Sequence, residues 1–189
     1  MSAWNITKVA YRGALPTLAV SAVGGLLAGS VLGGMDAELE NVPGLLVMVP
    51  AFLAIRGSVY GSLGSRLSSA LHQGLIEPVF EIDDRLANAA IAAILNGLLA
   101  SLFAAFLTFG LLSALDAPRA SLLTLVFIAL VGGALAGLAL TVTIVVVVFT
   151  GFRRGMNPDD LVGPAVTTAG DVFGMASLFV ATRLALAVT

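Results

Sequence analysis

Residues 121–152 read SLLTLVFIALVGGALAGLALTVTIVVVVFTGF, a stretch of 32 residues without one charged side chain. A helix that crosses a bilayer needs about 20 predominantly apolar residues. A surface helix of a soluble protein shows polar side chains along one face, and this stretch has no such face. The segment therefore predicts a membrane-spanning helix, and it decides how the rest of the chain is interpreted.

Four further apolar stretches surround this segment, and each is long enough to cross a membrane. The five predicted spans are approximately 15–34, 43–71, 87–115, 121–152 and 158–187. The longest polar stretch between them, 73–85, is too short for a separate soluble domain. We expect an all-α bundle of five transmembrane helices that forms one domain over 1–189, without a cytosolic regulatory domain and without a cleavable signal peptide.

The composition supports this class. Of 189 residues, 59% are hydrophobic and 11% charged, whereas a soluble domain carries about 25% charged residues. The composition excludes a soluble enzyme, and the net charge of −2 leaves no basic surface for nucleic acid. With no cysteine and the single histidine His72, a bound metal would be a hard cation held by oxygen atoms.

Lysine and arginine mark the cytoplasmic side of a membrane protein. In a five-span plan one side holds five of them and the other side two. The five are Lys8, Arg12, Arg85, Arg153 and Arg154, and the two are Arg119 and Arg183. We predict a multi-pass protein of the cell membrane with its N-terminus in the cytoplasm and its C-terminus outside. An odd number of spans in a short chain favours a homodimer.

Asp171 is the foremost candidate for a functional residue. It lies 13 residues after Pro158, about 20 Å along the last span, where an ionised side chain is costly unless it is used or paired. Asp160, Pro164, Thr167 and Thr168 precede it at helical spacing. Polar stripes of this kind line water-filled paths or helix interfaces. The alternative is a structural ion pair of Asp171 with Arg56 or Arg66.

Other polar residues accompany Asp171. In the second span, hydroxyl groups at helical spacing form one face, and Arg56 is deep enough to need a partner. In the third span, Asn96 either faces a pathway or joins two helices. The hydroxyl residues are Ser58, Ser62, Ser65 and Ser69.

Acidic residues precede and follow the spans, either as solvated loops or as mouths that concentrate cations. They are Asp36, Glu38 and Glu40 on the outer side and Glu77, Glu81, Asp83, Asp84, Asp159 and Asp160 on the inner side.

These features favour a divalent cation. Mg²⁺ is usually held by one or two carboxylates and keeps several waters. A symmetric dimer would bring two Asp171 side chains across its axis, where two negative charges need a cation between them. Mn²⁺ and Ca²⁺ fit the same chemistry.

Two stretches resemble one known family. Residues 50–75, PAFLAIRGSVYGSLGSRLSSALHQGL, and residues 157–175, NPDDLVGPAVTTAGDVFGM, are similar to the membrane domain of the MgtE-type magnesium transporters. The chain looks like a single-repeat relative of the animal solute carriers that fuse two such repeats. The resemblance implies a dimeric bundle with a cation path at the interface.

By this resemblance Asp171 would be the Mg²⁺-binding carboxylate, with Thr167, Thr168 and Gly170 beside it. A second set of residues would line the path from the second span, namely Gly57, Ser58 and Gly61. The family usually has asparagine where Ser58 stands, and its animal members have an acidic residue where Tyr60 stands. Both departures bear on ion affinity and selectivity.

Two other functions remain as alternatives. A membrane scaffold or subunit that transports nothing would use Asp171 only as an ion-pair partner. An intramembrane aspartyl protease would use the stretch Ala169–Gly170–Asp171, which is similar to the Gly-x-Gly-Asp signature. However, residue 168 is threonine and the spans hold no second aspartate near mid-membrane.

Overall fold

Helices make up almost all of residues 3–81 and 84–188, which are the residues that the computed structural model describes. Side chains are described for Leu15, 18–81 and 84–188. Three residues of the sequence analysis lie outside the described side chains. They are Lys8 and Arg12, which contribute to the predicted orientation, and Asp83 of the acidic segment. The six helices are α1 (Ala3–Gly33), α2 (Asp36–Asn41), α3 (Leu45–His72), α4 (Asp84–Ala114), α5 (Leu122–Arg153) and α6 (Pro158–Val188).

Four of these helices are long and apolar enough to cross a membrane, namely α3, α4, α5 and α6. Each rises about 40–50 Å at 1.5 Å per residue, so each exceeds the hydrocarbon thickness of about 30 Å. In α1 the apolar part within the described side chains, Leu18–Gly33, is shorter. The all-helical membrane bundle is thus confirmed with four candidate spans, while the fifth span stays a prediction.

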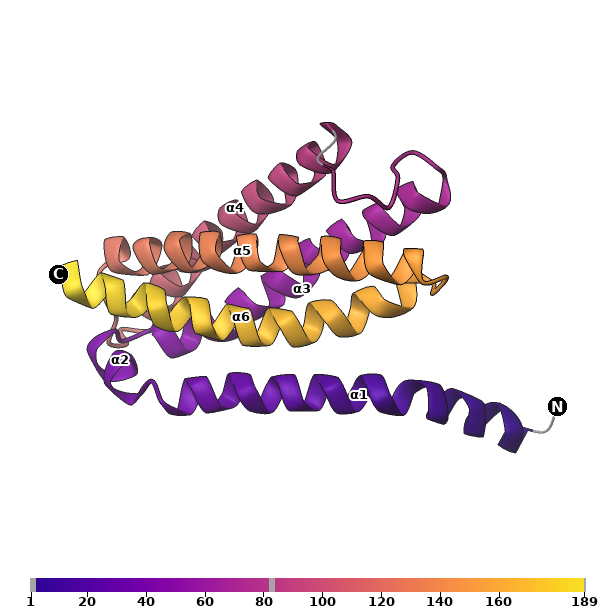
Figure 1. Ribbon diagram of the computed structural model, residues 1–189. Helices are drawn as coiled ribbons and strands as arrows, with labels where there is room; N and C mark the ends of the chain where they lie inside the picture. The colour runs from indigo at the N-terminus through magenta and orange to yellow at the C-terminus, as the bar shows by residue number, and fades with distance from the viewer. Residues whose placement is uncertain (1–2, 82–83, 189) are drawn as a thin grey trace.

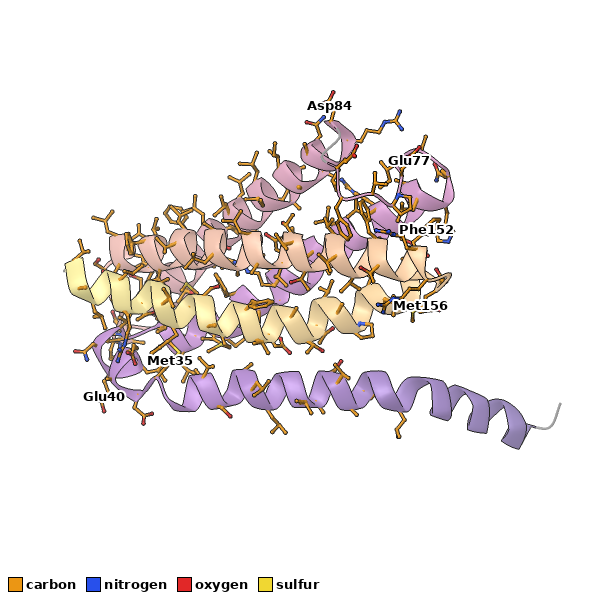
Figure 2. The ribbon with its side chains drawn as sticks, in the orientation of Figure 1. Met35, Glu40, Glu77, Asp84, Phe152 and Met156 are labelled. Atoms are coloured by element: carbon orange, nitrogen blue, oxygen red, sulfur yellow. The ribbon has the colours of Figure 1, made fainter. Side chains whose placement is uncertain are left out.

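The long helices run up and down beside one another (Figure 1). α5 lies at the centre and packs against α3, α4 and α6, while α1 packs along α6. One end of the bundle carries α2 and the C-terminal end of α6. The opposite end carries the α3–α4 loop and the α5–α6 turn. In Figure 2, Met35 and Glu40 mark the first end, and Glu77 and Met156 mark the second.

Two apolar clusters fill the bundle, one toward each end. The cluster near α2 includes Phe52, Ile128 and Leu178, and the cluster near the α5–α6 turn includes Tyr60 and Ile144. Burying each such side chain contributes about 1.5–3 kcal/mol in water, but in lipid close packing of small residues replaces much of that gain. A polar layer around Arg56 separates the clusters.

α2 is a short helix that the apolar pattern does not predict, and an ion pair ties it to α6. Arg183 Nε donates a hydrogen bond to Glu38 Oε1 at 2.8 Å. The Glu38 side chain is 5% exposed and the Arg183 side chain 67% exposed. The hydrogen bond from Arg183 lowers the pKa of the Glu38 carboxyl below its ordinary value.

The lowered pKa of Glu38 makes a pH-dependent contribution to stability. Because the folded state holds the carboxylate more strongly than the unfolded state, the stabilisation is present at neutral pH. It is lost as the pH falls through the folded-state pKa. We expect the melting temperature of the detergent-solubilised protein to fall by a few degrees as the Glu38 carboxylate becomes protonated. Melting curves between about pH 7 and pH 3 measure it, and Glu38→Gln should flatten this part of the profile. An unchanged profile in that variant would contradict the role of the pair.

Candidate functional site

α6 carries Asp171 to the middle of the bundle. The helix begins with Pro158, and the side chain of Asn157 caps it by accepting a hydrogen bond from the Asp159 N–H at 3.2 Å. Pro158 suits the first helical position because its missing N–H would be unpaired there anyway. Asp171 follows 13 residues later, about 20 Å from the start of the helix.

The Asp171 carboxylate is half-buried and unpaired. Among the described side chains no hydrogen bond or ion pair reaches it, and the ion pair between Arg183 and Glu38 lies at the end of the bundle. Arg56 and Arg66, the partners that a structural role would require, do not bind it. The geometry therefore leaves the carboxylate available for a ligand.

α3 presents a face of small and hydroxyl side chains that nothing in the described chain covers. A Cβ placed on Gly57 or Gly61 would meet no atom within 4 Å. Serines at helical spacing lie exposed on the same side of α3, and they are Ser58, Ser62, Ser65 and Ser69. Small residues on a lipid-facing surface allow another helix backbone to approach closely.

α3 and α6 pack tightly, so this face lies beside Asp171. A Cβ on Gly174 would lie 2.7 Å from Leu53 Cδ2, and one on Gly64 would lie 2.5 Å from Val162 Cγ1. Gly170, the residue before Asp171, faces the Arg56 side chain of α3. Gly57, which follows Arg56, therefore lies at about the same position along the bundle axis as Asp171.

The residues of the predicted polar stripe on α6 do not all face the same way. Thr167 is exposed, and its hydroxyl donates to the Gly163 carbonyl at 2.9 Å. Thr168 turns toward α1, where a Cβ on Gly24 would lie 2.6 Å from its Cγ2. Asp160, Pro164 and Thr168 line a mostly apolar cavity of about 480 Å³ next to α1 and α5.

A single copy of the chain does not gather the predicted metal-binding residues in one place. Ser58 lines a different cavity, between α3 and α4, from the one that Thr168 and Asp160 line. Among the side chains that the structure describes, no group of three or more histidine, cysteine, aspartate or glutamate residues could hold a metal. The described residues of one chain therefore do not form a complete ion site around Asp171.

Arg56 lies at the same level but on the inner side of α3, where it is fully buried. Its guanidinium donates to Ser101 Oγ of α4 and lies 4.0 Å from the centre of the Phe52 ring. Two of its nitrogens, Nε and Nη1, have no close hydrogen-bond partner within the described chain. The hydroxyl of Tyr60 also has no such partner. The sequence indicates that Arg56 needs a partner. It does not indicate that this partner is Ser101, because the serine lies 45 residues away and belongs to no motif.

Comparison with known proteins identifies relatives of the chain. The chain is 29% identical over 180 residues to solute carrier family 41 member 3 of Rattus norvegicus, covering 92% of this chain and 38% of that protein. It is 29% identical over 164 residues to solute carrier family 41 member 2 of Xenopus laevis, covering 79% and 28% respectively. The chain thus spans less than two-fifths of the curated relatives that it matches.

A family profile gives the stronger result. The profile of the MgtE family, described as divalent cation transporter, matches residues 49–181. The matched region begins near the start of α3, ends within α6 and contains both Asp171 and the uncovered α3 face. Because this family consists of transporters, the protease alternative is set aside. The chain belongs to the MgtE family of divalent cation transporters.

Proposed function

We propose that the protein transports Mg²⁺ across the cytoplasmic membrane along a path between α3 and α6, with Asp171 as the central ion-binding carboxylate. The observation that carries this proposal is the unpaired Asp171 side chain beside an uncovered face of α3. A carboxylate at this depth is costly in lipid, and a divalent cation removes that cost. Exposed Thr167 adds a hydroxyl on the same helix.

The proposed unit is a homodimer in which the uncovered faces of two copies meet. Gly57 and Gly61 leave room for a second backbone, as small residues do where membrane helices pack. A two-fold axis along this face brings two Asp171 carboxylates toward one ion. Mg²⁺ prefers one or two carboxylates and retained waters, so the dimer supplies the ligands that one chain lacks.

In the proposed orientation the α3–α4 loop and the α5–α6 turn face the cytoplasm, and α2 faces outward. Arg85, Arg153 and Arg154 lie at the cytoplasmic end, as the distribution of positive charge in membrane proteins requires. Asp160 lies near the inner start of α6 and is exposed. We assign it to the cytoplasmic mouth of the path, where a negative charge raises the local cation concentration.

Reconstitution tests the proposal directly. Liposomes that contain the purified chain and a Mg²⁺-sensitive dye should show fast, saturable Mg²⁺ entry, and protein-free liposomes should not. Size-exclusion chromatography with light scattering on the same sample measures the oligomeric state, for which a dimer is expected. Mg²⁺ entry equal to that of empty liposomes would favour the scaffold alternative instead.

A further inference from the structure

The seam between α3 and α4 differs in chemistry along its length. Toward the α3–α4 loop it holds a cavity of about 240 Å³, which is lined by apolar side chains and by one basic residue. The polar residues of this lining are Ser58, Ser62, Arg66 and Asn96. Toward the other end of the bundle the seam holds a second cavity of about 500 Å³, and almost all of its lining side chains are apolar.

The two cavities follow one another along both helices. On α3, Ile55 of the apolar cavity lies about one turn from Val59 of the polar cavity, and on α4, Ala100 lies about one turn from Asn96. The seam thus carries a basic, partly polar section that continues into an apolar section. An anionic phospholipid has the same division between its headgroup and its acyl chains.

Arg66 gives the polar section its charge. The residue is exposed, and no hydrogen bond or ion pair joins its guanidinium to another described residue. No carboxylate is among the residues that line the cavity. A guanidinium binds a phosphate group through two parallel hydrogen bonds, so this section of the seam suits an anionic group rather than a cation.

Arg66 also lies at the depth of lipid headgroups. It precedes His72, the last residue of the 28-residue helix α3, by six residues, which is about 9 Å. A helix of this length exceeds the hydrocarbon core by about 12 Å, or about 6 Å at each end if it is centred. The backbone of Arg66 is then only about 3 Å below the hydrocarbon boundary, and its long side chain reaches the phosphate layer.

The apolar section begins at a depth that an acyl chain reaches. Ile55 precedes Arg66 by 11 residues, which is about 16 Å along α3. One leaflet of a bilayer has a hydrocarbon thickness of about 15 Å. A lipid whose phosphate is bound at Arg66 therefore brings the end of its acyl chain to Ile55.

We propose that the α3–α4 seam binds an anionic phospholipid from the leaflet at the α3–α4 loop, which is the cytoplasmic leaflet in the orientation proposed above. The phosphate lies at Arg66, the glycerol ester groups lie toward Ser62, and one acyl chain continues to Ile55. Basic pockets between membrane helices on the cytoplasmic side bind anionic lipid headgroups in this way. The inference does not rest on the transport function, because it places no ion in the seam.

The lipid site is compatible with the proposed dimer. Arg66 follows Gly57 by nine residues, about two and a half turns of helix. The two residues therefore point to opposite sides of α3. A second copy that packs against Gly57 and Gly61 does not have to cover Arg66.

Native mass spectrometry of the full chain in detergent tests the headgroup preference. With equal amounts of phosphatidylglycerol and phosphatidylcholine that have the same acyl chains, the wild type should retain about fivefold more phosphatidylglycerol. Arg66→Gln should bring the ratio to about one, and Arg66→Lys should keep most of the excess because the charge remains. Arg154→Gln is the matched control, since Arg154 is exposed at the same end of the bundle and lines neither cavity.

Three outcomes would overturn the proposal. The first is equal retention of the two lipids by the wild type. The second is an excess of phosphatidylglycerol that persists in Arg66→Gln. The third is an excess that Arg154→Gln removes as completely as Arg66→Gln does, because the preference would then reflect the general charge of this end of the bundle.

Photo-crosslinking locates the lipid in the unaltered chain. We expect phosphatidylglycerol with a diazirine near the end of one acyl chain to label the seam around Ile55 and Ala100. Unlabelled phosphatidylglycerol should suppress this labelling more strongly than phosphatidylcholine does. Leu138 is the internal control, because it is 56% exposed on α5 at a similar depth and lines neither cavity. Its labelling should respond equally to both competitors. Equal suppression by both lipids at the seam, or no labelling there, would refute the site.

Discussion

Asp171→Asn should lower Mg²⁺ flux at least 100-fold while the proposed dimer remains intact. At an effective dielectric constant of 20, a divalent ion about 4–5 Å from one carboxylate gains about 7–8 kcal/mol. Dehydration offsets much of this energy. The expected loss corresponds to only about 2.7 kcal/mol, since each 1.36 kcal/mol is a factor of ten. Asparagine has nearly the same shape, so packing around Gly170 and Gly174 should not change.

Flux into dye-loaded liposomes measures the effect, and size-exclusion chromatography checks the dimer. Asp116→Asn is the matched control because Asp116 is exposed in the α4–α5 connection and has a positive φ of 49°, which asparagine tolerates well. The control should transport Mg²⁺ at the wild-type rate. Wild-type flux in Asp171→Asn would refute the assignment of this carboxylate.

The second large effect concerns stability. Gly137→Ala should destabilise the bundle by about 1–3 kcal/mol, as overpacking of a core does. A Cβ on Gly137 would lie 2.6 Å from the Tyr60 hydroxyl oxygen, which also lies 3.0 Å from the position of a Cβ on Gly97. The phenol is fully buried between these two helices, and a rigid ring yields less than an aliphatic side chain would.

The double variant Gly137→Ala with Tyr60→Phe should recover the lost stability. Without the oxygen, the nearest ring atom would lie 3.7 Å from the new Cβ, which is ordinary contact. Tyr60→Phe alone should cost at most about 1 kcal/mol, because the hydroxyl makes no close hydrogen bond in the described chain but interacts with the buried Arg56 guanidinium. Thermal melting in detergent measures all three variants.

Gly110→Ala provides the control for the glycine substitution. A Cβ at Gly110 would meet no atom within 4 Å, so alanine should raise the melting temperature through its better helix propensity. A melting temperature of Gly137→Ala that equals the wild-type value would contradict the tight fit around Tyr60.

Much of the fold is predictable from the sequence because uninterrupted apolar stretches have one main use, to cross a bilayer. The predicted spans and the observed helices α3, α4, α5 and α6 coincide closely. The short helix α2 has no apolar pattern and was not predicted. Its ion pair to Arg183 joins residues 145 positions apart, and no local spacing indicates such a contact.

The candidate site is predictable only in part. A lone aspartate in an apolar span can be identified without a structure, whereas the rotation of its helix depends on neighbouring helices. Thr167 and Thr168 both precede Asp171 at helical spacing, yet only Thr168 packs against α1. The partner of Arg56 is Ser101 rather than a carboxylate, because the three-dimensional arrangement of α3 and α4 decides it.

The depth of Asp171 has an electrical consequence. In the proposed path, a divalent ion that reaches this residue, about 20 Å along α6, has crossed about half of the transmembrane voltage. Each elementary charge gains about 2.3 kcal/mol per 100 mV across the whole membrane. Two charges over half the membrane therefore gain about 2.3 kcal/mol, so a cell interior at −100 mV favours occupancy from outside about fiftyfold.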